Sequence, residues 1–346
     1  VPTSRCLAVV GSGDLVFREA AKPGAIVTRV AASHIRVGTF EYFAARGDME
    51  SLKALADFTL DRHFPEIARN GDLDNKDKIL HLLQAVIGKQ IQLIVSWLRV
   101  GFIHGVMNTD NTAVSGETID FGPCAMMGIY HPGTVFSSID SQGRYAFGNQ
   151  PGIAQWNMAR LAEALLPLID TVPEKAVEQA EPLIRQFARD FDQAYREMLA
   201  NKLGIASPCG QANELAKTLL GQMQDKQLDY TQTFTRLALS LEDATEAEKL
   251  SQELGPWYHD WRVLLTDTGI AASSARTLMD KTNPQVIPRN HHVEAIIKEY
   301  EESGASQRID DFLTVLRSPY RRLAQTPDFQ DLPADGDRHY RTFCGT

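Results

Sequence analysis

The chain has 346 residues, of which 43% are hydrophobic and 23% are charged. This length and composition are typical of a globular protein with one large core or two lobes, and they exclude the disordered and fibrous classes. Its 35 basic residues are outnumbered by 44 acidic ones, which gives a net charge of −9. That balance argues against a nucleic acid as the main partner. A nucleotide is a better match than a nucleic acid for a chain with this charge.

The cysteine spacing and the apolar segments indicate which cellular compartment the protein occupies. None of the four cysteines lies in a CxxC pair or at a zinc-ligand spacing, so we expect mostly free thiols in a reducing compartment. The longest apolar stretch, residues 79–100, contains Lys89 and Arg99, which predicts a buried helix and no membrane partner. The chain opens on VPTSRCLAVV, without an initiator Met or a signal peptide. We therefore expect a fragment that begins within a domain, cytoplasmic in a bacterium or mitochondrial in a eukaryote.

The first thirty residues have strand character. Apolar and β-branched runs at residues 6–10 and 15–18 flank the turn sequence GSGD. A third run, residues 25–30, follows a turn predicted at Lys-Pro-Gly. GSGDLV lacks the third glycine of a phosphate-binding loop and precedes no helix, so it predicts a plain turn between strands.

From Thr39 onward, apolar residues recur at intervals of three and four, which predicts a mainly helical chain. The clearest helices are expected at residues 76–98, 151–169 and 173–203. Trp257, Tyr258 and Trp261 have helical spacing, which favours a core position over a base-stacking platform. The polar tail, residues 327–337, is expected to be poorly ordered.

The segment between residues 101 and 122 carries the chemistry-bearing residues. Protein kinases use H-x-D-x-x-x-x-N followed by D-F-G, in which the first Asp accepts a proton and the Asn and second Asp hold magnesium. HGVMNTDN places His104 and Asn111 at the His and Asn positions, and IDFG supplies Asp120. Val106 stands where the catalytic Asp belongs, and valine cannot accept a proton. Asp110 is the nearest carboxylate that can substitute.

These residues also have a purely structural interpretation, in which the polar side chains cap turns and DFG arises by chance. Against it stands the order of the two motifs after an apolar helix, as in the kinase pattern. Amide and carboxylate oxygens at Asn111 and Asp120 are suited to a Mg²⁺ or Mn²⁺ ion that also touches phosphates.

Longer strings extend the pattern over most of the chain. RVAASHIRVGTFEYFAARGD precedes the two motifs, and DSQGRYAFGNQPGIAQWNMARLAEAL follows them. Together with HGVMNTDN and TIDFGP, these strings resemble the SelO family of protein adenylyltransferases. The resemblance implies an α+β, protein-kinase-like fold in which partial N-terminal-lobe strands precede a large, mostly helical C-terminal lobe.

The resemblance implies three regions: residues 1–32 as the remnant of a nucleotide-binding N-terminal lobe, residues 33–172 as the core of the C-terminal lobe, and residues 173–346 as a helical extension. The family's Gly-rich nucleotide loop and phosphate-binding Lys would precede Val1. We therefore expect a chain of this extent to have impaired activity.

The activity implied is transfer of AMP from ATP, bound in a flipped orientation, to Ser, Thr or Tyr hydroxyls of proteins. Asp110 is similar to the family's catalytic base, and Asn111 and Asp120 to its metal ligands for Mg²⁺ or Mn²⁺. Asp120 would also lie beside ATP. Arg29 and Arg36 match two family arginines that contact the phosphates, a role suited to a planar guanidinium.

Two other functions remain open. A phosphotransferase of the small-molecule-kinase type also uses an HG start and IDFG, although Val106 argues against it. A non-catalytic, pseudokinase-type module that binds nucleotide is the alternative outside enzymes.

Two further features receive structural interpretations. Family members often carry a C-terminal Cys that pairs with a Cys after DFG; Cys344 matches the first and Cys124 is a weak match for the second, so two free thiols are the default expectation. His291 and His292 are expected to form an exposed pair at a helix N-terminus, pointing to different sides without a carboxylate.

Overall fold

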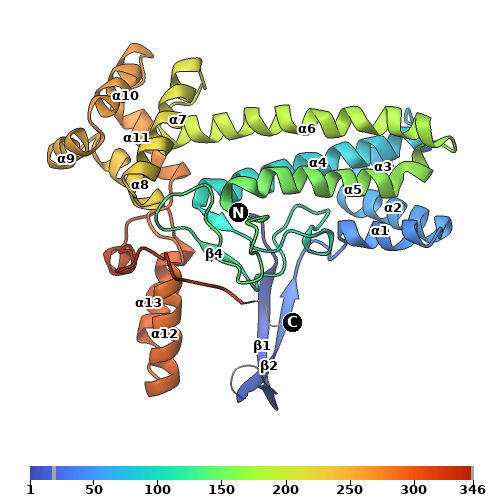
Figure 1. The fold of residues 1–346 in the computed structure, drawn as a ribbon, viewed down its shortest axis with the longest axis horizontal. Coiled ribbons are helices and arrows are strands. Elements are labelled where there is room, and N and C mark those ends of the chain that lie inside the picture. Colours follow the sequence, from blue (N-terminus) through green and yellow to red (C-terminus); the bar gives the residue numbers. More distant parts are fainter. Residues whose placement is uncertain (18–20, 344–346) are drawn as a thin grey trace.

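The computed structural model describes residues 1–17 and 21–343 of the chain, and it has an α+β architecture in which helices dominate (Figure 1). The strands are β1 (Arg5–Phe17), β2 (Ala21–Val30), β3 (Phe102–Ile103) and β4 (Ala125–Met126). The α-helices are α1 (Val37–Ala45), α2 (Met49–His63), α3 (Pro65–Ala68), α4 (Asn75–Val100), α5 (Gln150–Ile169), α6 (Pro173–Lys202), α7 (Gly210–Asp225), α8 (Tyr230–Leu239), α9 (Ala244–Leu254), α10 (Pro256–Asp267), α11 (Ala272–Thr282), α12 (Asn290–Ser303) and α13 (Gln307–Arg317). Short 3₁₀ turns are η1 (Thr109–Asn111), η2 (Phe147–Asn149) and η3 (Thr326–Phe329).

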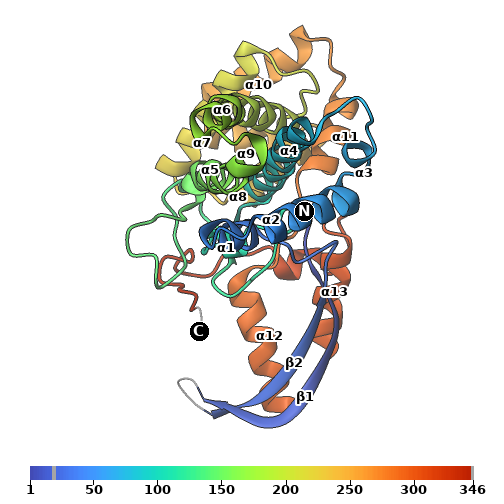
Figure 2. The same cartoon turned by 90° about the vertical axis from the view of Figure 1, so that its right-hand side faces the viewer.

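Strands β1 and β2 form an antiparallel hairpin that extends away from the helical body (Figures 1 and 2). Its apolar side chains are exposed, including Leu7, Phe17 and Ile26. The base of the hairpin is anchored because Thr118 pairs with Thr3 and its backbone N–H donates to the Pro2 carbonyl at 3.1 Å. This anchor places the end of β2 beside the IDFG segment.

The turns expected within the first thirty residues are wrong. GSGD is a bulge inside one continuous strand, because the register shifts between Gly11 and Leu15 and pairing then resumes. Gly13 has φ +82°, which glycine adopts without strain. Lys-Pro-Gly lies within β2, where Pro23 pairs with Leu15.

Helices α4, α5 and α6 run side by side and form the body of the molecule (Figure 1). Helix α4 begins after Asp74, whose carboxylate accepts from the Asp77 N–H at 2.7 Å, and it ends at Gly101 with φ 78°. Within the described ranges it is the one helix long and apolar enough to cross a membrane, and half of its most apolar window is buried in the protein. The prediction that this stretch is a buried helix is confirmed.

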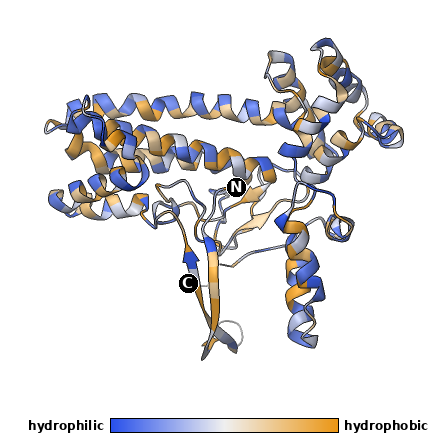
Figure 3. Cartoon of the chain, turned by 180° about the vertical axis from the view of Figure 1, so that it is seen from behind, coloured by the Kyte–Doolittle hydropathy of each residue, from blue (hydrophilic) through white to orange (hydrophobic). Residues whose placement is uncertain are grey.

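The other long helices match their predicted ranges within two residues. Pro173 occupies the first turn of α6, where a missing N–H costs no hydrogen bond. Phe187 is buried, whereas Val177 near the start of the helix is exposed. Figure 3 shows hydrophilic residues over much of α6 and hydrophobic ones along the hairpin.

Helices α7 to α11 form a second helical group at one end of α6 (Figure 1). Trp257, Tyr258 and Trp261 are buried there. The indole N–H groups of Trp257 and Trp261 donate to the carbonyls of Leu215 and Leu203, at 2.8 and 3.0 Å. The predicted core position of these three aromatic residues is confirmed.

In the C-terminal tail, residues 327–337 pack against the rest of the protein, so the expectation that they are poorly ordered is wrong. Phe329 is buried against Phe312 of α13, with ring centroids 4.9 Å apart. Further along, the Thr342 hydroxyl donates to the Pro123 carbonyl at 2.6 Å. The tail therefore reaches the segment that follows IDFG.

Candidate active site

His104 joins the two predicted motifs. It lies directly after β3 and is fully buried, with its ring stacked on Trp97 at a centroid distance of 5.1 Å. Its Nε2 donates to the Ile119 carbonyl at 2.8 Å, and its Nδ1 accepts the Val106 N–H at 3.3 Å. Burial lowers the pKa of His104, so the ring is neutral at pH 7 and this pattern of one donor and one acceptor is satisfied. The imidazole thus holds IDFG beside HGVMNTDN.

Turn η1 presents Asp110 and Asn111. The Asn108 side chain caps this turn by accepting the Asn111 N–H at 3.0 Å, so the capping interpretation holds for Asn108. The Asn111 Nδ2 donates to the Val106 carbonyl at 3.2 Å, which leaves its Oδ1 uncommitted. Asp110 is exposed, and its carboxylate lies over Gly38 of α1 where a Cβ would overlap it.

Asp120 has a strained backbone. Its φ is 55°, in the left-handed region that few residues other than glycine adopt. Its carboxylate is exposed and receives one long hydrogen bond, 3.4 Å from the Gly122 N–H. Strain of this kind is concentrated at functional sites, which makes Asp120 a candidate on structural grounds as well.

The two arginines lie at the edge of these loops. The Arg29 guanidinium lies over the ring of Phe121, 4.7 Å from its centroid, next to Asp120 in the chain. The backbone of Arg36 bridges to Ala113, two residues beyond Asn111. Both side chains are exposed. The structure therefore brings the five predicted site residues to the neighbourhood of two loops, although the Arg36 side chain makes no hydrogen bond or ion pair with the described residues.

The donor set fits a hard divalent cation. Asn111 Oδ1 and the Asp120 carboxylate are oxygen donors without strong protein partners, and their loops are tied together by His104. Mg²⁺ and Mn²⁺ prefer such oxygens and complete their shells with water or phosphate.

Several positioning residues were missed from the sequence. Buried Asn157 of α5 donates to the Met107 carbonyl and to the Thr112 hydroxyl, both at 2.9 Å, and so spans η1. Gln150 accepts the His104 N–H at 3.1 Å. Both residues lie in the resembling string after IDFG, but its periodicity predicts only an amphipathic helix.

Glu117 fixes the segment between the two arginines. Its carboxylate accepts the Ala32 N–H at 2.8 Å, while the Arg62 Nε donates to the Ala32 carbonyl at 2.6 Å. Residues 31–36 are therefore held from both sides. No local signal links Glu117 to Ala32, because they are 85 positions apart.

The three cysteines within the described residues, Cys6, Cys124 and Cys209, are not joined in disulfides. Cys124 has a free thiol, and burial raises its pKa to about 11, so it is protonated at neutral pH. Cys344 lies outside the described residues, so the expectation for its pairing stays a prediction.

The expectation of an exposed histidine pair is wrong. His292 is buried, and both rings face the carboxylate of Asp331, with Nε2–oxygen distances of 3.8 Å for His291 and 2.9 Å for His292. Burial lowers the pKa of both imidazoles. Residue spacing alone misses this arrangement because the carboxylate comes from the tail.

Comparisons with known proteins agree with this geometry. A family profile described as "Protein adenylyltransferase SelO" matches residues 1–317. The chain is 49% identical over 346 residues to a protein nucleotidyltransferase YdiU of Teredinibacter turnerae, covering all of this chain and 71% of the relative. It is also 49% identical to the YdiU of Pseudoalteromonas translucida, with the same coverage. It is 47% identical to that of Rhizobium leguminosarum, of which 69% is covered. With its two motif loops joined through His104 and this similarity over its whole length, the chain belongs to the SelO family of protein adenylyltransferases.

Proposed function

We propose that this chain transfers AMP from ATP to Ser, Thr or Tyr hydroxyls of proteins, with Asp110 as the base. The observation that carries the proposal is the exposed Asp110 carboxylate, held next to Asn111 on a turn that His104 joins to Asp120. Membership of an adenylyltransferase family supplies the reaction class.

In the proposed step, Asp110 takes the proton of the attacking hydroxyl. The hydroxyl oxygen forms a bond to the α-phosphorus of ATP, and the bond from that phosphorus to the bridging oxygen of the β-phosphate breaks. Pyrophosphate leaves with the electron pair. An exposed carboxylate on a rigid turn suits this role because a protein hydroxyl must reach it from solvent.

Asn111 and Asp120 would hold the divalent cation, Mg²⁺ or Mn²⁺, through their side-chain oxygens. When bound, such an ion neutralises charge on phosphate oxygens. The protein's own contribution is orientation: His104 and Asn157 fix the loops that carry these two oxygens. Preorganised groups need no rearrangement as charge develops.

Arg29 and Arg36 would bind the phosphates of ATP. Arg29 has support from its position over Phe121, which directs a permanent positive charge toward the Asp120 loop. Arg36 has support only from its backbone position beside Ala113.

We also propose that the hairpin, residues 1–32, belongs to a nucleotide-binding lobe of a kinase-like fold, residues 33–172 to its catalytic lobe, and residues 173–346 to a helical extension. The exposed apolar residues of the hairpin suit a sheet surface that packs against further chain. A cytoplasmic location in a bacterium fits the reducing cysteine pattern and the bacterial relatives.

The test uses the full-length protein with ATP labelled at the α- or the γ-phosphate. Label from the α-position should appear on protein and should disappear in Asp110→Ala, while ATP binding persists. Transfer of γ-label alone would establish a phosphotransferase. Nucleotide binding without transfer of either label would establish a binding module.

A further inference from the structure

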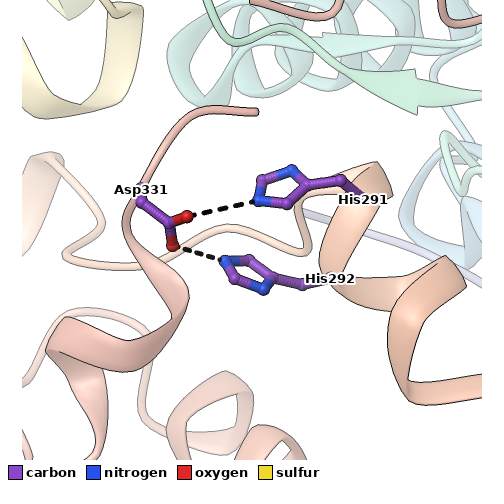
Figure 4. A group of neighbouring side chains, drawn as sticks. All are labelled: His291, His292 and Asp331. Carbon is purple, nitrogen blue, oxygen red and sulfur yellow. Dashed lines mark hydrogen bonds and ion pairs between the residues drawn. The ribbon is translucent and has the colours of Figure 1, made fainter. Parts of the chain in front are cut away.

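A second cluster of metal-ligating side chains lies away from the proposed active site. His291 and His292 lie in the first turn of α12, and Asp331 follows η3 in the tail (Figure 4). One ligand atom from each of the three residues can be chosen so that all lie within 4.8 Å of one another. The tail, not the helix, supplies the carboxylate.

His291 is the unusual member of this cluster. Both of its ring nitrogens are buried, and neither makes a hydrogen bond within the described chain. Its Nε2 is 3.8 Å from the Asp331 Oδ2, which is too long for a hydrogen bond. His292, by contrast, donates from Nε2 to Asp331 Oδ1 at 2.9 Å. Buried polar atoms normally have partners, so the unpaired nitrogens of His291 need an explanation.

A cation between the three side chains would supply a partner for one of these two nitrogens, because each residue of the cluster offers one ligand atom. Ligand atoms around a tetrahedral zinc ion are about 3.4 Å apart, given zinc–nitrogen bonds of about 2.1 Å. In the structure His291 faces Oδ2 of Asp331 at 3.8 Å and His292 faces Oδ1 at 2.9 Å. Rotation of the exposed Asp331 side chain would bring one oxygen to the zinc-ligand separation from both imidazoles. Water would complete the set of ligands.

Arg289 and Arg308 are the nearby cations, and both add to burial in lowering the pKa of His292. The Asp331 carboxylate, however, acts on each imidazole more strongly than either arginine. Arg289 pairs with Asp229 at 2.8 Å, and Arg308 pairs with Glu299 at 3.5 Å. The Asp331 carboxylate is open to solvent, with 66% of its side chain exposed, so an ion has a path of entry.

We propose that His291, His292 and Asp331 form a binding site for a divalent transition-metal ion of the zinc class. Two imidazoles and one carboxylate suit zinc better than magnesium, which prefers oxygen ligands alone. The site differs in its donors from the Asn111 and Asp120 pair.

Such an ion would fasten the tail to the segment after IDFG. Asn290, which precedes His291, accepts the Met126 N–H at 3.4 Å and donates to the Met126 carbonyl at 3.3 Å. Met126 ends β4, six residues beyond Asp120. Metal at Asp331 would therefore join three segments: the tail, the start of α12 and the strand behind the proposed active site.

The experiment measures Zn²⁺ binding to the chelator-treated full-length protein by calorimetry, together with the melting temperature. His291→Gln is the decisive variant, because the ring loses no hydrogen bond within the protein. We expect it to melt like the parent without zinc, to bind at least about tenfold more weakly at one site, and to lose the zinc-induced rise in melting temperature. His259→Gln changes an exposed histidine of α10 and should behave like the parent.

Asp331→Asn provides a second test that leaves the fold intact. The asparagine oxygen can still accept from His292, but the charged ligand is gone. It should also weaken zinc binding at this site. The proposal fails if the parent shows no zinc binding that these variants abolish, or if His291→Gln keeps full zinc affinity. In either case the cluster serves only to hold the tail to α12 by a hydrogen bond.

Discussion

The carboxylate of Asp110 lies over the α-carbon of Gly38, in the space that any side chain at position 38 would occupy. Gly38 has no positive φ, so the backbone of α1 does not itself require glycine there. The requirement comes from Asp110. Gly38, which has no side chain, thus leaves the space that the carboxylate of the proposed base occupies.

Gly38→Ala should therefore impair AMP transfer. Alanine favours helix by about 1 kcal/mol over glycine, yet its methyl group must displace Asp110. We expect the rate of transfer to fall by about tenfold or more, since small misplacements of a catalytic group have effects of this size. Gly88→Ala is the matched control, because a Cβ there meets nothing within 4 Å. Unchanged AMP transfer in Gly38→Ala would argue that Asp110 is not the catalytic base.

Asp120 combines a proposed ligand with a left-handed backbone, and two substitutions separate these properties. Asparagine tolerates φ 55°, so Asp120→Asn should keep the parent's stability and lose metal-dependent transfer. Asp120→Ala should lose transfer and also about 1 kcal/mol of unfolding free energy. Chemical denaturation and a labelled-ATP assay measure the two effects. Transfer retained in Asp120→Asn would argue against the ligand role.

Arg29 and Arg5 allow a matched comparison within the hairpin. Arg29 lies over Phe121, whereas the side chain of Arg5, a residue paired with Val30, makes no hydrogen bond, ion pair or cation–π contact in the described part of the chain. Arg29→Ala should raise the KM for ATP several-fold by removing a phosphate-binding charge. Arg5→Ala removes the same charge and should leave KM unchanged. Equal effects would indicate that only the general positive potential of the hairpin matters.

Local patterns predicted the helices well because their causes are local. The ranges of α4 and α6 follow from apolar spacing, from Asp74 as a cap and from Pro173 in a first turn. The motif residues around Asp110 and Asp120 were predicted as site residues because their order along the chain is itself the signal.

What the sequence did not predict depends on contacts between distant residues. Gly38 meets Asp110, and Asp331 meets the histidine pair, only after the chain has folded. The tail looked disordered by composition, yet a single buried aromatic residue, Phe329, packs it against α13. The turn residues of GSGD predict a break between two strands. In the fold, strand pairing continues on both sides of GSGD, and the segment forms a bulge.

Lys202 gives a prediction about the core. It is the last residue of α6, and its buried ammonium donates to the Arg99 carbonyl at 2.9 Å and lies 4.0 Å from the centroid of the Phe234 ring. Burial lowers the pKa of Lys202 well below its usual value of 10.5. Between the lowered value and 10.5, the unfolded chain binds a proton at this lysine that the folded protein does not. The contribution of Lys202 to the unfolding free energy therefore rises with pH across that window.

Lys202→Met should remove this contribution. Methionine has a similar length and fills the space beside Phe234 without a titrating group. We expect the unfolding free energy of the variant to rise less with pH than that of the parent when both are measured by denaturant titration between pH 7 and 9.5. Lys217→Met alters an exposed lysine of α7 and should leave the parent's pH dependence intact. If Lys202→Met and the parent show the same slope, the ammonium stays charged in the core, stabilised by the backbone carbonyl of Arg99 and the aromatic rings.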